Sequence, residues 1–436
     1  MPVKPAWEAT VHSTVQSTET LVFVTLLQLI VMIFAARLGN TVLRRLGQPG
    51  VIGEILAGLI LGPSLFGHYF PDASAFVFGA KPAVAVTIIS QIGLVLLMFQ
   101  IGMDFDFSHL TRPRNRNAVI GISAASVSVP FALGFIIGQI SAPLLAAKVD
   151  PLVYSLFFGV GLAITALPVL GRILREVDLG RTELGVVAIS AAAFNDVVGW
   201  ILLAGISAYA TAHFSLSGMA WQIAGILGLL AVSFLVLRPL VRWLLRLYPI
   251  KEGQIAPNLT AIILVMIFAM GICTFKLGIF AIFGGFLAGL LFHAHKDFVE
   301  VWRRQVGQFV LVFFLPVFFT FTGLRTNVLG LSTSGDLFWL ALTLSAAAFG
   351  KIVPVYVAGR LSGFNGKESA ILGSLMNTRG LMELIVLDVG YDLGILPPKV
   401  FTMLVIMAIV TTVMTGPLLR VLLPRTGHVI PVGVEA

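Results

Sequence analysis

Long apolar runs separated by short polar connections fill most of the chain. About thirteen runs reach or approach the roughly 20 residues that a helix needs to cross a bilayer, and they lack the alternation of a barrel strand. The pattern therefore predicts an all-α membrane protein with about 13 transmembrane helices. The predicted spans lie near 20–37, 49–67, 83–103, 117–140, 151–173, 183–208, 218–241, 257–275, 277–293, 306–324, 337–359, 368–390 and 400–423.

The basic residues predict how these spans are oriented. Of the 28 Lys and Arg residues, 20 fall in loops on one side of the membrane, 6 fall on the other, and two lie within spans. Since short cytoplasmic loops are enriched in Lys and Arg, we expect the tail 1–19 outside and the tail 424–436 in the cytoplasm, with the protein in the cell inner membrane. With 11% charged residues the chain is not soluble, and its net charge of +8 reflects topology rather than nucleic-acid binding.

The transmembrane domain over 20–423 permits an internal symmetry. If six spans over about 20–208 repeat as six spans over about 257–423, the span at 218–241 is a linker and the odd offset inverts the second copy. The fifth and twelfth spans, which this offset pairs, contain the strongest helix-breaking residues. Inverted repeats with discontinuous helices at corresponding positions are typical of secondary transporters.

Two ionisable residues, Asp196 and Lys351, fall near the middle of predicted spans. A charge there costs from about 3 to above 10 kcal/mol, so such residues usually serve a function. A buried carboxylic acid favours its protonated form, so Asp196 is predicted to hold a proton and trade it for a cation, with the oxygen of Asn195 as a further ligand. Asp196 is the simplest partner for Lys351, either in a salt bridge broken by the substrate cation or in a fixed one.

The interrupted spans supply further candidates. The Thr165 hydroxyl, with carbonyls freed by Pro168, can ligate a cation, although an ordinary proline kink explains the pattern equally well. Arg379 and Glu383 are spaced i, i+4 beside the expected break at Asn377, so we expect them to neutralise one another. Stabilisation of the irregular backbone is the favoured role for this pair, ahead of ion contact.

Glu54 lies near the cytoplasmic end of the second span, where a structural role is favoured over a place in an ion pathway. No metal-ligand cluster, cofactor-binding loop or nucleophile triad is found, and no His falls in mid-span. We therefore expect no enzyme activity, no cofactor and no metal beyond a transported monovalent cation. The alternatives to an antiporter are a passive cation channel, which would conduct without proton coupling, and an organic-anion symporter of related fold.

Four motifs follow one another along the chain: VIGEILAGLILGPSLFG, GLAITALPVLGRIL, FNDVVGWILLA and GSLMNTRGLMELIVLDVG. Together they resemble the second family of monovalent cation:proton antiporters, which includes bacterial potassium-efflux transporters, sodium/proton antiporters and plant cation/proton exchangers. The resemblance covers about residues 20–423. It implies exchange of Na+ or K+ for H+ by an elevator-type mechanism, in a homodimer embedded in the bilayer, with the two discontinuous helices crossing at mid-membrane.

The resemblance also implies roles for individual residues. Asp196 matches the ion- and proton-binding aspartate, Asn195 its neighbour, Thr165 the threonine of the broken helix, and Lys351 the basic residue facing the aspartate. Electrogenic members have two adjacent acids, and Asn195 replaces the first of them here, which favours electroneutral exchange. Lys351, in contrast, is typical of electrogenic members, so the sequence leaves the stoichiometry open.

Overall fold

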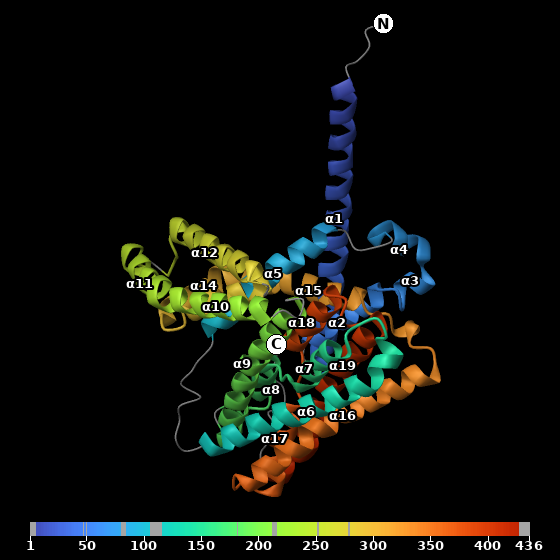
Figure 1. The fold of residues 1–436 in the computed structure, drawn as a ribbon, viewed down its shortest axis with the longest axis vertical. Coiled ribbons are helices and arrows are strands. Elements are labelled where there is room, and N and C mark those ends of the chain that lie inside the picture. The colour runs from blue at the N-terminus through green and yellow to red at the C-terminus, as the bar shows by residue number, and fades with distance from the viewer. Residues whose placement is uncertain are drawn as a thin grey trace.

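The regular elements of the chain are helices (Figure 1). The computed structural model describes residues 6–46, 48, 50–79, 84–104, 116–180, 182–211, 216–250, 253–277 and 280–426. The α-helices are α1 (Ala6–Arg45), α2 (Gly50–Leu61), α3 (Phe66–Tyr69), α4 (Pro71–Phe78), α5 (Val84–Asp104), α6 (Arg116–Leu145), α7 (Pro151–Ala163), α8 (Leu167–Glu176), α9 (Glu183–Thr211), α10 (Leu216–Val232), α11 (Arg238–Leu247), α12 (Pro257–Lys276), α13 (Ala281–Leu290), α14 (Lys296–Trp302), α15 (Leu315–Leu324), α16 (Ser334–Leu361), α17 (Gly366–Met376), α18 (Leu381–Asp392) and α19 (Pro398–Leu422). Three π-helical segments, Ser233–Leu237, Arg303–Gly307 and Val310–Phe314, join or precede them.

The chain is a multi-pass membrane protein. In the described ranges, ten helices are long and apolar enough to cross a bilayer, and α17 with α18, bent by 41° at their junction, passes as one more span. The predicted fifth span coincides with α7 and α8, and the predicted ninth span coincides with α13. Helices α7 and α13 are apolar but too short to cross a bilayer alone, so neither is among the ten. Every predicted run thus coincides with a helix or a broken helix.

The ends of the chain differ from the predicted tails. Helix α1 begins at Ala6, so residues 6–19 continue the first helix, which extends beyond the other helices in Figure 1. At the other end, a short 3-10 turn at Pro424–Thr426 follows α19, and the rest of the predicted tail, residues 427–436, lies outside the described residues. Five residues at the start, 1–5, lie outside them as well.

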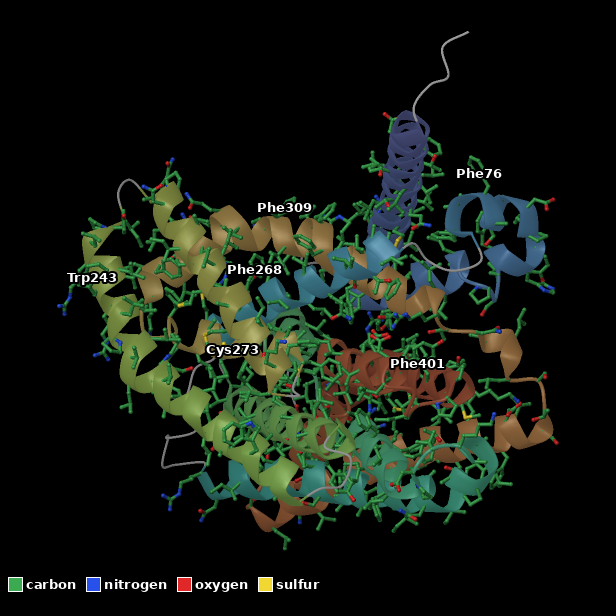
Figure 2. All side chains as sticks on the ribbon, turned by 45° about the horizontal axis from the view of Figure 1, so that its top comes forward. Phe76, Trp243, Phe268, Cys273, Phe309 and Phe401 are labelled. Carbon is green, nitrogen blue, oxygen red and sulfur yellow. The ribbon has the colours of Figure 1, made fainter. Side chains whose placement is uncertain are left out.

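Large apolar side chains are exposed on many of the outer helices. Phe76 and Trp243, at outer edges of the molecule in Figure 2, are 68% and 56% exposed, whereas Phe401 in the interior is fully buried. A soluble monomer rarely exposes contiguous apolar surface on this scale. The surface is therefore suited to contact lipid chains, as the apolar runs predict.

The helices pack into two bundles. Helices α1, α2, α5, α12, α13 and α15 contact one another and form what we call the panel bundle, and α6, α7, α8, α9, α16, α17, α18 and α19 form the core bundle. Helices α10 and α11 connect the two. Each bundle takes three predicted spans from the first half of the chain and three from the second. This partition agrees with the pairing of spans expected from the repeat, although the inversion itself rests on the sequence argument.

Close helix contact inside the panel bundle depends on glycine. A Cβ placed on Gly58 of α2 would lie 2.8 Å from the Cα of Thr320 and 2.9 Å from the Cα of Gly323, both in α15. These are backbone atoms, which cannot turn aside as a flexible side chain can. Gly58 therefore lets two helix backbones approach directly, as small residues do in membrane helix pairs.

Replacing Gly58 with Ala is expected to force α2 and α15 apart and to destabilise the protein by about 1–3 kcal/mol, as overpacking does. Gly205→Ala is the matched control, because no atom lies within 4 Å of its ideal Cβ and the added methyl favours the helix. The thermal midpoint of the purified protein should fall for Gly58→Ala and hold or rise for Gly205→Ala. Equal midpoints for the two variants would contradict the close contact.

Candidate functional site

The first helix break separates α7 from α8. Helix α7 begins at Pro151, where the Asp150 carboxylate caps the backbone N–H of Val153 at 2.9 Å. It ends at Ala163, and Ile164 has extended backbone angles. Pro168, which lies in the first turn of α8, has no N–H to offer a continuing helix, so a break before it is expected. Pro168 thus starts a second half-helix instead of kinking a continuous one.

The second break separates α17 from α18. The Asn365 side chain and Glu368 form a capping box that starts α17, which ends at Met376. Four residues, 377–380, follow before α18 begins. Gly380 has a φ of 157° and a ψ of −125°, a conformation essentially restricted to glycine. This glycine allows the chain to change direction between the two half-helices.

The two breaks lie against each other in the core bundle. The N–H of Ala166 donates to the carbonyl of Thr378 at 3.1 Å, and the Thr165 hydroxyl donates to the carbonyl of Met376 at 3.1 Å. Both acceptors are at the end of α17, where helix carbonyls lack intrahelical donors. Residues more than 200 positions apart in the chain thus satisfy one another at the interruption.

Helix α19 holds the second break in place. The Thr412 hydroxyl accepts the N–H of Arg379 at 2.9 Å and lies 3.0 Å from the Arg379 carbonyl. The Asn377 side chain donates to the carbonyl of Thr411 at 3.1 Å. These contacts replace the helical hydrogen bonds that the break removes, which is necessary because unpaired buried backbone groups are costly. The sequence showed Thr411 and Thr412 only as part of an apolar run, and their role depends on packing between helices.

Two cations neutralise the carbonyl end of α7. The Arg379 guanidinium donates to the carbonyls of Gly161 at 2.9 Å and Leu162 at 2.8 Å, and the Lys351 ammonium donates to the carbonyl of Ala163. All five residues are essentially unexposed. The last carbonyls of a helix carry the negative end of its dipole, so cations are stabilised there. This arrangement corrects the expected direct partnership of Lys351 with Asp196: the ammonium instead binds the broken backbone.

Asp196, in contrast, lies at the amide end of a helix. Its carboxylate accepts the backbone N–H of Leu167, the first residue of α8, where the positive end of a helix dipole favours an anion. The side chain is 3% exposed, and its Oδ1 atom has no hydrogen-bond partner in the described structure. Lys351 interacts with Asp196 through its charge at longer range. One carboxylate oxygen is therefore available to a ligand.

Asn195 is fixed beside this carboxylate by its amide nitrogen. Its Nδ2 atom donates to the hydroxyl of Ser126 at 2.8 Å and to that of Thr165 at 3.2 Å, while its Oδ1 atom is buried without a partner. Ser126 was not among the sequence candidates, and its place in a small-residue stretch of α6 gave little signal. The structure thus brings together Asp196, Asn195 and Thr165, and leaves two unpaired oxygens of the kind that hard cations prefer.

The remaining candidates fall into two places. Arg379 and Glu383 form the expected ion pair at 3.4 Å, fully buried beside the break, and Glu383 lies within charge range of Lys351. Glu54 lies apart from them in the panel bundle, where it is 3% exposed and its Oε1 atom accepts the Asn40 side chain of α1 at 2.6 Å. That buried contact between two helices fits the structural role favoured for Glu54.

A small cavity of about 10 Å³, with room for about one water molecule, lies where the bundles face each other at the second break. Its wall in the panel bundle comes from the start of α2, and its wall in the core bundle comes from α8, the break and α19. The lining residues are Val51, Ile52, Ile55, Val169, Arg379, Gly380, Ala408, Ile409 and Thr412. The cavity is almost entirely apolar and brings space to within one residue layer of the paired helix ends.

The sequence is similar to known membrane transporters over almost its whole length. Residues 29–424 match the family described as sodium/hydrogen exchanger, transmembrane. The Na(+)/H(+) antiporter NhaS4 of Synechocystis is 36% identical over 94% of this chain and 100% of its own length. Cation/H(+) antiporter 18 of Arabidopsis thaliana is 36% identical over 90% of this chain, which spans 48% of that longer protein. K(+)/H(+) antiporter 1 of Saccharomyces cerevisiae is 30% identical over 86% of this chain and 44% of its own length.

The fold is also similar to a solved structure. The sodium proton antiporter MjNhaP1 from Methanocaldococcus jannaschii superposes with a TM-score of 0.62, covering 92% of this chain and 96% of that one. The two sequences are 18% identical, so the likeness concerns the fold alone. The all-helical architecture predicted from the sequence is confirmed, whereas the exact number of spans and their inverted repeat stay predictions.

Replacing Thr412 with Val should loosen the second break, because the isosteric side chain leaves the buried N–H of Arg379 without its acceptor, at a cost of about 1–3 kcal/mol. Thr415→Val is the matched control: its hydroxyl is equally buried but bonds only the Thr411 carbonyl of its own helix. Thermal unfolding should show a clear loss for Thr412→Val and a smaller one for Thr415→Val. Losses of the same size would show that Thr412 does not anchor the break.

Proposed function

The chain belongs to the sodium/hydrogen exchanger family, and from this premise we propose that it exchanges a monovalent cation, Na+ or K+, for H+ across a membrane. Relatives that align over most of this chain are named as Na+/H+, K+/H+ or cation/H+ antiporters. The single observation that carries the proposal is the buried, unpaired carboxylate oxygen of Asp196, whose carboxylate lies at the start of α8 and whose neighbour in sequence, Asn195, also has a buried unpaired oxygen.

The proposed mechanism is competition for Asp196. A proton on the carboxylate neutralises the buried charge, and so does a bound cation, but the same oxygen cannot hold both. Asn195, which precedes Asp196 in α9, and Thr165, which accepts the Asn195 amide, have neutral oxygens of the kind that can replace part of a cation's hydration shell. The N–H of Leu167 stabilises the carboxylate while neither ion is bound. Each passage of the site across the membrane therefore carries either H+ or the cation.

Lys351 supports an electroneutral exchange in this scheme. Its ammonium binds the Ala163 carbonyl at the end of α7, so its charge already has a structural partner and need not leave when a cation arrives. With Asn195 in the position of a possible second acid, Asp196 is the acid at the proposed site that changes partners. One proton then exchanges for one cation. The same reasoning gives Arg379 and Glu383 a structural role at the break.

The two bundles suggest how the site reaches both sides. We propose that the core bundle moves as a unit against the panel bundle, as in an elevator, since the ligand-binding residues and both helix breaks lie in the core bundle. In this proposal the panel bundle forms the interface of a homodimer, and the protein lies in the inner membrane. The distribution of Lys and Arg among the loops supports an N-terminus outside and a C-terminus in the cytoplasm.

Asp196→Asn is expected to abolish exchange, because an amide neither releases a proton nor neutralises a cation. In proteoliposomes containing a pH dye, cation-driven proton movement should fall to the level of protein-free vesicles, while thermal stability holds. Asp336→Asn, which removes an acid paired with Lys399 outside the site, should retain exchange. Exchange by the Asp196 variant at the wild-type rate would refute competition at this residue.

The rate of exchange is expected to be independent of membrane potential if one proton is traded for one cation. Na+, K+ and Li+ can be tested in turn in the same vesicles, with the membrane potential either clamped to zero or imposed. The imposed potential should come from an ion other than K+, because K+ is itself a test cation. Asn195→Asp adds a second acid and should introduce a dependence on potential if both acids then titrate during transport. A strong dependence in the wild-type protein would overturn the electroneutral proposal.

A further inference from the structure

A second group of charged side chains joins α15 of the panel bundle to α18 of the core bundle. The Arg325 guanidinium lies 3.4 Å from the Asp388 carboxylate and 2.7 Å from that of Asp392. The Thr322 hydroxyl donates to the other oxygen of Asp388 at 2.6 Å. We call these four residues the clasp, since they connect elements that belong to different bundles.

The clasp is only partly sheltered from solvent. The Arg325 side chain is 15% exposed and that of Asp388 is 6% exposed, whereas that of Asp392 is 33% exposed. Arg325 also lies over the rings of Phe321, at 4.1 Å, and Tyr391, at 5.4 Å, so one aromatic from each bundle covers its cation. Removing one member of such a cluster leaves a partly buried charge without its partner, which costs more than an exposed pair. The clasp is therefore a discrete set of ionic contacts between the bundles.

The clasp and the cavity lie at different levels of the interface between the two bundles. Along α18, Asp388 lies eight residues beyond Gly380 at the cavity wall, about 12 Å at the helical rise. Along α2, the cavity residue Ile55 is followed by Gly58, which packs on Thr320 of α15 just before the clasp. The bundles are thus separated by a cavity at one level of their interface and held together by ionic contacts at another.

A neighbouring hydrogen bond closes the same end. The N–H of Asn327, just after α15, donates to the hydroxyl of Thr402 in α19 at 3.2 Å, which is another contact from the panel side to the core side. Nothing comparable lines the cavity, whose walls are apolar apart from Arg379 and Thr412. The interface therefore differs along its length: ionic and polar contacts join the bundles at the clasp end, and a small apolar pocket lies between them at the second break.

We propose that the clasp is a gate of the transport cycle: it holds the core bundle in the arrangement seen here, and it must break before the core bundle can move and open the site at the clasp end. This proposal rests on the alternating access in the proposed function and adds the residues that bias it. Arg325, Asp388, Asp392 and Thr322 then act by positioning the core bundle, without touching the transported ion.

The test measures how accessible the cavity is. Cys273 is the only cysteine of the chain and is exposed, so a Cys273→Ser background with Ile409→Cys places a single thiol at the cavity wall. Arg325→Gln should lower the labelling rate of this thiol by a soluble maleimide by a factor of about three or more, because the arrangement that places residue 409 at this pocket becomes less populated. Asp388→Asn should act in the same direction, and Arg325→Lys should keep most of the labelling.

The control breaks an ion pair inside one bundle. Lys399 in α19 pairs with Asp336 in α16 at 2.8 Å, and both helices belong to the core bundle, so Lys399→Gln should leave the labelling rate unchanged. Unfolding would raise labelling, so a fall cannot come from a damaged protein. Unchanged labelling in Arg325→Gln and Asp388→Asn, or an equal fall in Lys399→Gln, would overturn the gate.

Labelling does not depend on exchange, so the two proposals fail separately. If the wild-type protein moves no protons against cations but the clasp variants still close the cavity, the proposed function fails and the gate stands. If exchange through Asp196 holds but labelling never responds to the clasp, the gate alone fails.

Discussion

The structure depends on satisfying two broken helices inside an apolar environment. Each break exposes a carbonyl end and an amide end, and no water is present in the hydrocarbon region to pair with them. Arg379 and Lys351 bind the carbonyls that end α7, Asp196 accepts an amide at the start of α8, and Thr412 binds the backbone of the second break. These charged side chains in the core bundle therefore bind backbone groups at helix ends directly, whereas Lys351 and Asp196 interact with each other only through their charges.

This matching has a chemical consequence for the site. Lys351 binds a backbone carbonyl and Asp196 keeps an unpaired oxygen, so in the proposed exchange Asp196 changes partners between a proton and a cation. Asn195 is held by Ser126 and Thr165 through its nitrogen, which directs its oxygen away from those bonds. The polar groups that are satisfied hold the geometry, and the few that are unsatisfied are those that a ligand can use.

The boundary between the bundles carries the other half of the proposed mechanism. A moving core bundle needs an interface that holds together in each state but is not permanently fused. An apolar cavity facing α2 and a partly buried ionic clasp facing α15 meet this need, because the first offers little attachment and the second gives a discrete set of contacts to break. In the proposed cycle, an interface with two discrete arrangements converts a small change at the site into a movement of whole helices.

The helical membrane fold, the position of each apolar run and the ionisable residues in mid-membrane could all be predicted from the sequence. They follow from the length of the runs, their hydropathy and the cost of burying a charge. It also placed both helix breaks, from Pro168 and from the Asn377–Gly380 segment. It predicted the charge interaction between Lys351 and Asp196 but not the bond of the Lys351 ammonium to the Ala163 carbonyl, and it missed Ser126, Thr412 and the clasp. These contacts are visible only in the folded protein, because each joins residues from helices that are distant in the sequence. The hydrophobic pattern indicates which residues are buried, but it does not indicate which helix end or side chain they contact.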